Sequence, residues 1–303
     1  TLSDLASMFA IPDVPDVSHV FPERHARAVA AVAEVQARLK QSGSTFVFRD
    51  FQSDSLARMA VHDGAICAWE QGLGKSVAAF AWPMVCQIMA GRDLKSLLVA
   101  PAGLHKQLTL DAWEMFRIIL KPVGNLELGT SPLGTFTFHL ATFEDVVRHP
   151  EWRHAWDCVV IDEGVRLKGS ESLIGCALRG LDPSFRLILS GTPIKNKLSD
   201  LCPLCHWCCE RDPQDRRRWP WNKHYQTTSD FRNRFLVRQR NISREREDRA
   251  STGSTNTVQN LPRLWKLLAP IIARHRKSDL PPGDIVLKHR HTICLKQDEV
   301  QRA

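Results

Sequence analysis

The segment Trp69–Ser76, with the sequence WEQGLGKS, constrains the fold of this chain more than any other feature. It lies between a short apolar run at 65–68, typical of a buried strand, and a longer one at 77–82, typical of a helix that ends near Pro83 or continues beyond a kink there. Glycines let backbone N–H groups turn toward phosphate oxygens, and a helix start adds the positive end of its dipole. The segment therefore predicts a phosphate cradle in an α/β fold.

Within this cradle, Lys75 is expected to reach the β and γ phosphates and the Ser76 hydroxyl to bind magnesium. The pattern usually opens with glycine, and this chain has Trp69 there, so a glycine-rich turn without a ligand remains the alternative. The flanking apolar runs favour the cradle. The predicted nucleotide-binding residues of the loop are Gln71, Gly72, Leu73, Gly74, Lys75 and Ser76.

Two further apolar runs end in residues that suit a nucleotide site. Val159–Ile161 is followed by Asp162 and Glu163, and the alternative reading is that two acids merely cap a strand. Downstream of a phosphate loop, Asp162 is expected to hold the magnesium shell and Glu163 to polarise the attacking water. The run at 187–189 ends in Ser190-Gly191-Thr192, where small hydroxyl residues could sense the γ phosphate.

Short apolar runs alternate with helical patterns from residue 46 onward, which predicts a three-layer α/β fold with a central, mostly parallel sheet. The runs lie at 65–68, 96–100, 136–140, 158–161 and 187–189. Residues 1–44 are expected to form an N-terminal extension with a helix at 23–40, and 45–303 the nucleotide-binding lobe. A polar insertion is expected at about 210–260, followed by a helix at 261–272 and a basic run at 274–277.

The composition indicates a soluble, intracellular protein with a polyanionic partner. The chain of 303 residues has a formal net charge of +8, which favours nucleic acid. No apolar run approaches the roughly 18 residues that span a bilayer, and the nine cysteines are expected to be reduced. The chain begins with Thr1 and ends soon after a strand-like stretch at 285–295, so we expect a fragment of a longer protein.

The order of these motifs resembles the first, N-terminal motor lobe of the Swi/Snf-like DNA translocases in helicase superfamily two. The loop 70–76 is similar to the family's EMGLGKT, 162–168 (DEGVRLK) to DEAHRLK, and 190–196 (SGTPIKN) to GTPIQN. Further similar segments are 49–52, 98–104, 141–144 and 274–282. The resemblance extends from about Arg49 to the end of the chain and implies a RecA-like P-loop lobe.

The resemblance also implies roles for individual residues. Gln52 would contact adenine, with Arg49 near it, and Gly191 and Thr192 would couple the phosphate state to lobe closure. Lys75, Asp162 and Glu163 would be catalytic, with Ser76 and Asp162 on Mg²⁺. The residues expected to contact nucleic acid are Pro101, Ala102, Thr142 and Phe143.

The sequence departs from the family pattern in two ways. Gly164 and Val165 stand where the family has alanine and histidine, which puts the coupling of hydrolysis to the neighbouring motif in doubt. The resemblance covers the first lobe alone, so we expect the second lobe, which in the family supplies arginine fingers worth roughly 10³ to 10⁵ in rate, to be missing from this chain. We therefore expect this chain to bind ATP and to hydrolyse it poorly by itself.

The predicted function is the ATP-binding lobe of an ATP-dependent translocase on double-stranded DNA. The alternatives are a strand-separating helicase, the motor subunit of a restriction-type system, or an ATP-responsive nucleic-acid-binding module that never hydrolyses. A separate question concerns Cys202–Cys209, whose four thiols and one imidazole could bind zinc. The chain has no second Cys-x-x-Cys pair, so buried helix thiols are the favoured interpretation.

Overall fold

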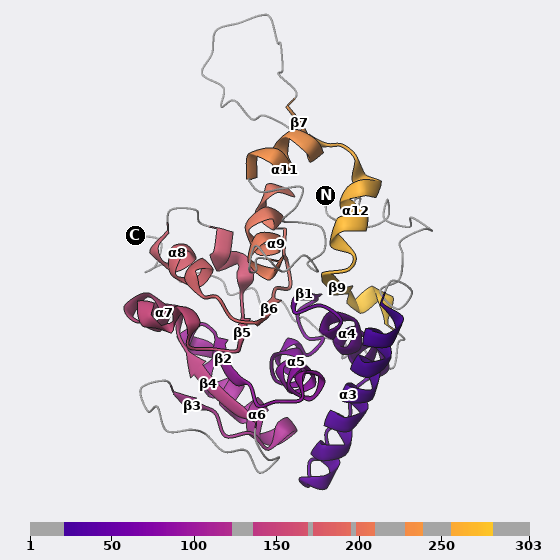
Figure 1. Cartoon of the computed structure of the whole chain (residues 1–303), viewed down its shortest axis with the longest axis vertical. Helices are drawn as coiled ribbons and strands as arrows, with labels where there is room; N and C mark the ends of the chain where they lie inside the picture. Colours follow the sequence, from indigo (N-terminus) through magenta and orange to yellow (C-terminus); the bar gives the residue numbers. More distant parts are fainter. Residues whose placement is uncertain are drawn as a thin grey trace, which may run out of the picture.

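A fully parallel sheet of seven strands, in the order β3-β4-β2-β5-β6-β1-β9, forms the centre of the protein (Figure 1). The computed structural model describes residues 21–122, 136–168, 172–194, 198–209, 228–238 and 256–280. The strands are β1 Gly64–Trp69, β2 Lys95–Val99, β3 Lys121–Pro122, β4 Thr137–Ala141, β5 Cys158–Ile161, β6 Phe185–Leu189 and β9 Ile272–His275.

Helices cover both faces of this sheet, and each face has its own apolar core (Figure 1). Successive residues of a strand point to opposite faces, so Ala65 and Cys67 of β1 enter one core and Ile66 enters the other. The first core is covered by α3 Pro22–Gln41, α4 Asp50–Ala60, α5 Lys75–Ala90 and α6 His105–Phe116. The second is covered by α7 Phe143–Arg148, α8 Leu173–Gly180, α9 Leu201–Cys209, α11 Thr228–Phe235 and α12 Leu261–Leu268. The three-layer prediction is confirmed.

The five strands predicted from apolar runs between residues 65 and 189 are present, with ends that differ by at most two residues, whereas the strand-like stretch at 285–295 lies outside the described residues. Helix α5 continues through Pro83, as one of the two alternatives predicted. The predicted helix at 261–272 is too long, because α12 ends at Leu268 and Ile272 begins β9. Strand β9 was missed since its four residues, Ile-Ala-Arg-His, carry no apolar pattern; their place in the sheet comes from hydrogen bonds to β1.

The N-terminal helix α3 packs on the lobe. Its buried residues, which belong to the first core, are Ala28, Ala31, Val32, Val35 and Leu39, and its neighbours are α4 and α5. Residues 1–20 lie outside the described part, so the boundary at residue 44 stays a prediction. Of the polar insertion, the described residues form α11 and an antiparallel pair, β7 Leu236–Arg238 with β8 Asn256–Val258.

Helix α9 carries the cysteine cluster, and the structure supports buried thiols there. Burial raises the pKa of the Cys205 and Cys208 thiols well above the ordinary value, which keeps them neutral. Cys208 Sγ donates a hydrogen bond to the Ala65 carbonyl at 3.3 Å. Across the described ranges, no three His, Cys, Asp or Glu side chains come together as a metal site, and no disulfide joins the cysteines. In the same ranges no helix is long and apolar enough to cross a membrane.

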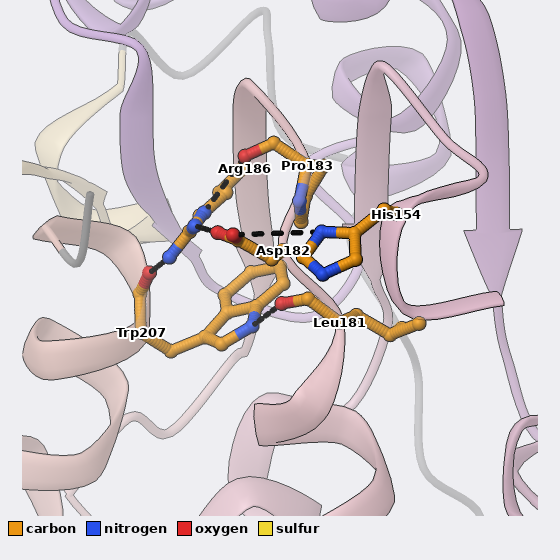
Figure 2. Close-up of polar contacts among 6 residues, drawn as sticks. All are labelled: His154, Leu181, Asp182, Pro183, Arg186 and Trp207. Carbon is orange, nitrogen blue, oxygen red and sulfur yellow. Dashed lines mark hydrogen bonds and ion pairs between the residues drawn. The ribbon is translucent and has the colours of Figure 1, made fainter. Parts of the chain in front are cut away.

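A buried arginine ties α9 to the start of β6 (Figure 2). The Arg186 side chain is 2% exposed, and its guanidinium donates to the carbonyls of Pro183 at 3.1 Å and Trp207 at 2.7 Å. The same group donates to the Asp182 carboxylate and lies 5.7 Å from the Trp207 ring centroid. The Trp207 indole N–H donates to the Leu181 carbonyl at 3.2 Å. The Arg186 guanidinium therefore supplies hydrogen bonds both to a carbonyl near the end of α9 and to one in the turn before β6.

Replacing Arg186 with methionine should lower the free energy of unfolding by about 3 kcal/mol, because two buried carbonyls lose their donor. Urea unfolding of the variant, followed by circular dichroism, measures this loss. Arg153→Met, at an exposed position, is the control and should change stability by less than about 0.5 kcal/mol. Equal unfolding midpoints for the two variants would contradict the assignment.

A second prediction concerns pH. His62, between α4 and β1, has a pKa lowered to about 4 by burial and by the charge of Arg24. In the unfolded chain His62 should titrate near pH 6.5, so the unfolded state binds more protons than the folded state between pH 4 and 6.5. The free energy of unfolding therefore has its full value above pH 6.5 and decreases as the pH falls toward 4. Between pH 7 and 5 the loss should be about 2 kcal/mol. Urea unfolding at both pH values should show a smaller loss in His62→Gln; an equal loss would refute the role of His62.

Candidate nucleotide-binding site

The predicted phosphate loop joins the end of β1 to the start of α5. Gly72 has φ 92° and Gly74 has φ 87°, in the left-handed region that favours glycine. A Cβ at Gly74 would lie 2.8 Å from the Gln52 Nε2 atom. The loop conformation and its close contact with α4 therefore require glycine at position 74, and the backbone angle favours it at 72.

Trp69, where the pattern usually has glycine, is the last residue of β1. Its side chain is fully buried, with the ring centroid 5.3 Å from that of Phe51 and 6.4 Å from that of His275. The tryptophan thus fills the core beneath the loop, while its carbonyl accepts a hydrogen bond from Lys75 Nζ at 3.3 Å. The departure from the pattern concerns packing and leaves the loop backbone intact.

The elements predicted to form the site meet at one edge of the sheet. Strands β5, β6 and β1 are neighbours, so the residues that follow their carboxyl ends lie at the same edge of the sheet. Gly191, after β6, lies beside the lysine, because a Cβ there would be 3.5 Å from Lys75 Nζ. Thr192 is exposed next to it, and residues 195–197 of this motif lie outside the described part.

The two predicted acids follow β5 and differ in environment. Burial raises the pKa of Asp162, against the opposing effects of the Glu163 backbone N–H, which donates to Asp162 Oδ1 at 2.9 Å, and of the Lys75 charge. Glu163 is exposed and has φ 52°, an unfavourable backbone conformation for a side-chain-bearing residue. Strain of this kind concentrates at functional sites. The turn thus directs one carboxylate inward and leaves the other accessible.

These residues fit a magnesium nucleotide. Ser76, in the first turn of α5, and Asp162 offer the hard oxygen atoms that Mg²⁺ prefers. The left-handed backbone at Gly72 and Gly74 gives the loop a conformation in which backbone N–H groups can turn toward phosphate oxygens. The donor set and the loop therefore suit a phosphate-bound Mg²⁺, while the assignment of each residue stays a prediction.

Gln52, predicted to contact adenine, is buried at the start of α4. Its Oε1 accepts the Arg49 backbone N–H at 3.0 Å, and its Nε2 donates to the Leu73 carbonyl at 3.2 Å. The amide therefore joins the upstream segment to the phosphate loop, a positioning role that the sequence pattern did not reveal. An adenine contact would use the remaining hydrogen-bonding capacity of this amide.

The residues predicted to contact nucleic acid follow β2 and β4, which are neighbours in the sheet. Pro101 is half-buried and Ala102 exposed, whereas Phe143 is 3% exposed and packs in the second core. Thr142 caps α7, its hydroxyl accepting the Asp145 N–H at 3.1 Å. The exposed Arg166 lies with its guanidinium 5.7 Å from the Phe143 ring, so a cation that was not predicted accompanies this surface.

Gly164 stands where the family that this sequence resembles has alanine, and it lies against β6. A Cβ at this position would be 2.1 Å from Ile188 Cγ2, a distance that requires movement of one side chain. Ile188 is fully buried in the second core, so it has little room to move. The local packing explains the glycine without involving Asp162 or Glu163.

A strand, a glycine-rich loop and a helix, with an acid pair two strands away, define the class of this protein as a P-loop nucleotide-binding α/β lobe. The model of the family described as "SNF2-related domain" matches residues 37–303. This match covers most of the chain, and the chain therefore belongs to the family of SNF2-related domains.

Individual relatives are more distant. A "DNA repair and recombination protein RAD54-like" of Drosophila ananassae is 25% identical over 262 residues, 79% of this chain and 31% of that protein. The "ISWI chromatin-remodeling complex ATPase CHR17" of Arabidopsis thaliana is 25% identical over 233 residues, 72% of this chain and 19% of that protein. The chain thus spans less than a third of the length of these relatives.

Among solved structures, the "Sulfolobus solfataricus SWI2/SNF2 ATPase core in complex with dsDNA" is similar with a TM-score of 0.56 and 20% sequence identity. The similarity covers 78% of this chain and 46% of that one. At this identity the comparison shows the shared RecA-like fold, in agreement with the sheet described above.

Gly164→Ala should destabilise the protein by about 1 to 3 kcal/mol because it overpacks the second core. Ile188→Ala removes the clashing Cγ2 atom and should cost about 2 to 5 kcal/mol by itself. The double variant should lose less stability than the sum of the two single losses, by at least about 1 kcal/mol. Urea unfolding of all variants measures this coupling.

Gly180→Ala is the matched control, because a Cβ at Gly180 has no atom within 4 Å. Its effect should be within about 0.5 kcal/mol, alone or combined with Ile188→Ala. Additive losses for Gly164→Ala and Ile188→Ala would show that the contact with Ile188 does not explain the glycine.

Proposed function

We propose that this chain is the ATP-binding first lobe of a DNA-dependent ATPase that translocates along double-stranded DNA. The observation that carries the proposal is the convergence of Lys75, Gly191 and the acids Asp162 and Glu163 at the carboxyl ends of three neighbouring strands. This arrangement provides a cation for phosphate groups, oxygen ligands for a metal and an exposed carboxylate for water.

Within the proposal, each residue has a separate task. Lys75 and the loop N–H groups bind the β and γ phosphates, and Ser76 and Asp162 hold Mg²⁺. When bound, Mg²⁺ neutralises charge on the phosphate oxygens. Glu163 orients the attacking water and accepts its proton, while Gly191 and Thr192 link the phosphate state to movement of a second lobe. Gln52, with Arg49, places the adenine side of the nucleotide.

The DNA partner is supported by charge and by similarity. The chain has a net charge of +8, and a structure of the same fold bears the description "in complex with dsDNA". The printed names of similar proteins concern DNA repair and chromatin remodelling. We assign the backbone contact to the surface after β2 and β4, with Pro101, Ala102 and Thr142, inside a cellular compartment that contains DNA; Phe143 packs beneath this surface in the second core.

The proposal requires a second lobe, because stabilising charge on the transferring phosphate in such enzymes involves arginine residues from outside the first lobe. We therefore expect the lobe, residues 45–303, to bind nucleotide with slow turnover. A module that binds ATP without hydrolysing it would show the same affinity with no turnover even when a second lobe is supplied.

The test is titration of a fluorescent ATP analogue with Mg²⁺ into the wild-type chain and its variants. Lys75→Ala should weaken binding at least about 10-fold, because a charged hydrogen-bond donor is lost. Glu163→Gln should retain the affinity and lower any DNA-stimulated turnover by about 10²-fold or more. Glu151→Gln, an exposed acid on the short helix Pro150–His154, is the control. Equal binding by wild type and Lys75→Ala would exclude this loop as the site.

A further inference from the structure

Strand β9, the last strand in the described part of the chain, brings a basic segment to the phosphate loop. It pairs in parallel with β1, and His275 lies opposite Trp69. The chain continues from β9 into a short helical turn, Lys277–Asp279, as β1 continues into the loop. Because the carboxyl ends of parallel strands meet at one edge, residues just after β9 face the same crevice as the loop.

Two hydrogen bonds donated by backbone N–H groups hold this segment against the loop. The Glu70 N–H donates to the His275 carbonyl at 2.9 Å, and the Lys277 N–H donates to Glu70 Oε2 at 2.8 Å. On the other side, His275 Nε2 lies 2.7 Å from Ser55 Oγ, and its ring centroid is 5.2 Å from that of Phe51. The end of β9 is therefore fixed by both α4 and the first residue of the loop.

The Lys277 side chain extends over Gly72. Its Cε and Nζ atoms lie 3.5 and 3.6 Å from the position that a Cβ at Gly72 would occupy. Gly72 is exposed and Lys277 is half-buried, so the ammonium stands at the open side of the loop. No ion pair within the described residues involves Lys277, and the neighbouring acid Glu70 accepts its backbone N–H.

We propose that Lys277 is a second lysine of the nucleotide site, whose ammonium binds the β and γ phosphate oxygens from the side opposite Lys75. The inference rests on the proposed function and adds a residue to it. A polyphosphate carries several negative charges, and an ammonium fixed near the loop glycine provides a charge-assisted donor without major rearrangement. The nucleotide phosphates would thereby hold the segment that follows β9.

The test compares ATP and ADP affinities, with Mg²⁺, of the wild type and of Lys277→Ala, Lys277→Arg and Lys266→Ala. Lys266 lies exposed on α12, so its replacement removes the same charge elsewhere. Lys277→Ala should weaken ATP binding about 10-fold, and ADP binding less, since a phosphate contact is lost. The ATP affinity of Lys277→Arg should stay within about threefold of wild type, because the charge is retained. That of Lys266→Ala should stay within about twofold, because the lost charge lies far from the loop.

Three results would overturn the inference. In the first, Lys277→Ala matches Lys266→Ala while Lys75→Ala loses affinity, which leaves the proposed function intact. In the second, Lys277→Ala lowers affinity for duplex DNA alone, which assigns the ammonium to the DNA backbone. In the third, the wild type binds neither nucleotide, and the proposed function fails as well. Thermal unfolding of each variant checks that Lys277→Ala keeps the fold.

Discussion

The parallel hydrogen bonding of β5, β6 and β1 is the constraint on which the rest of this structure depends. The register that pairs Cys67 with Leu189 and Ile161 with Ile188 brings the three strands to an end at the same edge. The phosphate loop, the acid pair and Gly191 follow these ends directly. None of the three segments provides all the groups alone, because the loop supplies the lysine and backbone N–H groups whereas the turn after β5 supplies the carboxylates; the sheet brings them together.

Packing on both faces of the sheet maintains this register and restricts which residues can occupy some positions. Gly164 leaves room for Ile188, and a Cβ at Gly64 would lie 1.8 Å from the Cys208 carbonyl oxygen. Arg186 secures α9 at the opposite end of the sheet from the phosphate loop, where its guanidinium satisfies carbonyls that water does not reach. The functional edge is thus supported by contacts that carry no chemistry themselves.

The sequence predicted some parts of the fold and the site well and others poorly, for physical reasons. Strands such as Cys158–Ile161 are continuous apolar runs because both faces of a parallel sheet are buried, and the glycine-rich loop carries its own signal. Strand β9 gave no such signal, as its Arg274 and His275 are half-buried at the sheet edge. Nor did the pattern show that Phe143 is buried, since an aromatic ring suits a core and a ligand surface equally.

By itself the sequence determined the class of this protein, because the phosphate loop and the motif after each strand consist of consecutive residues that can be recognised without the fold. Glycine spacing, a lysine and an acid pair have few other uses in this order. Only the tertiary structure decided which distant groups join them. Gln52 reaches Leu73 and Lys277 reaches Gly72 across 21 and 205 positions of the chain, through the packing of α4 and the pairing of β9 with β1. Such contacts depend on the register of the sheet, which is a property of the folded chain as a whole.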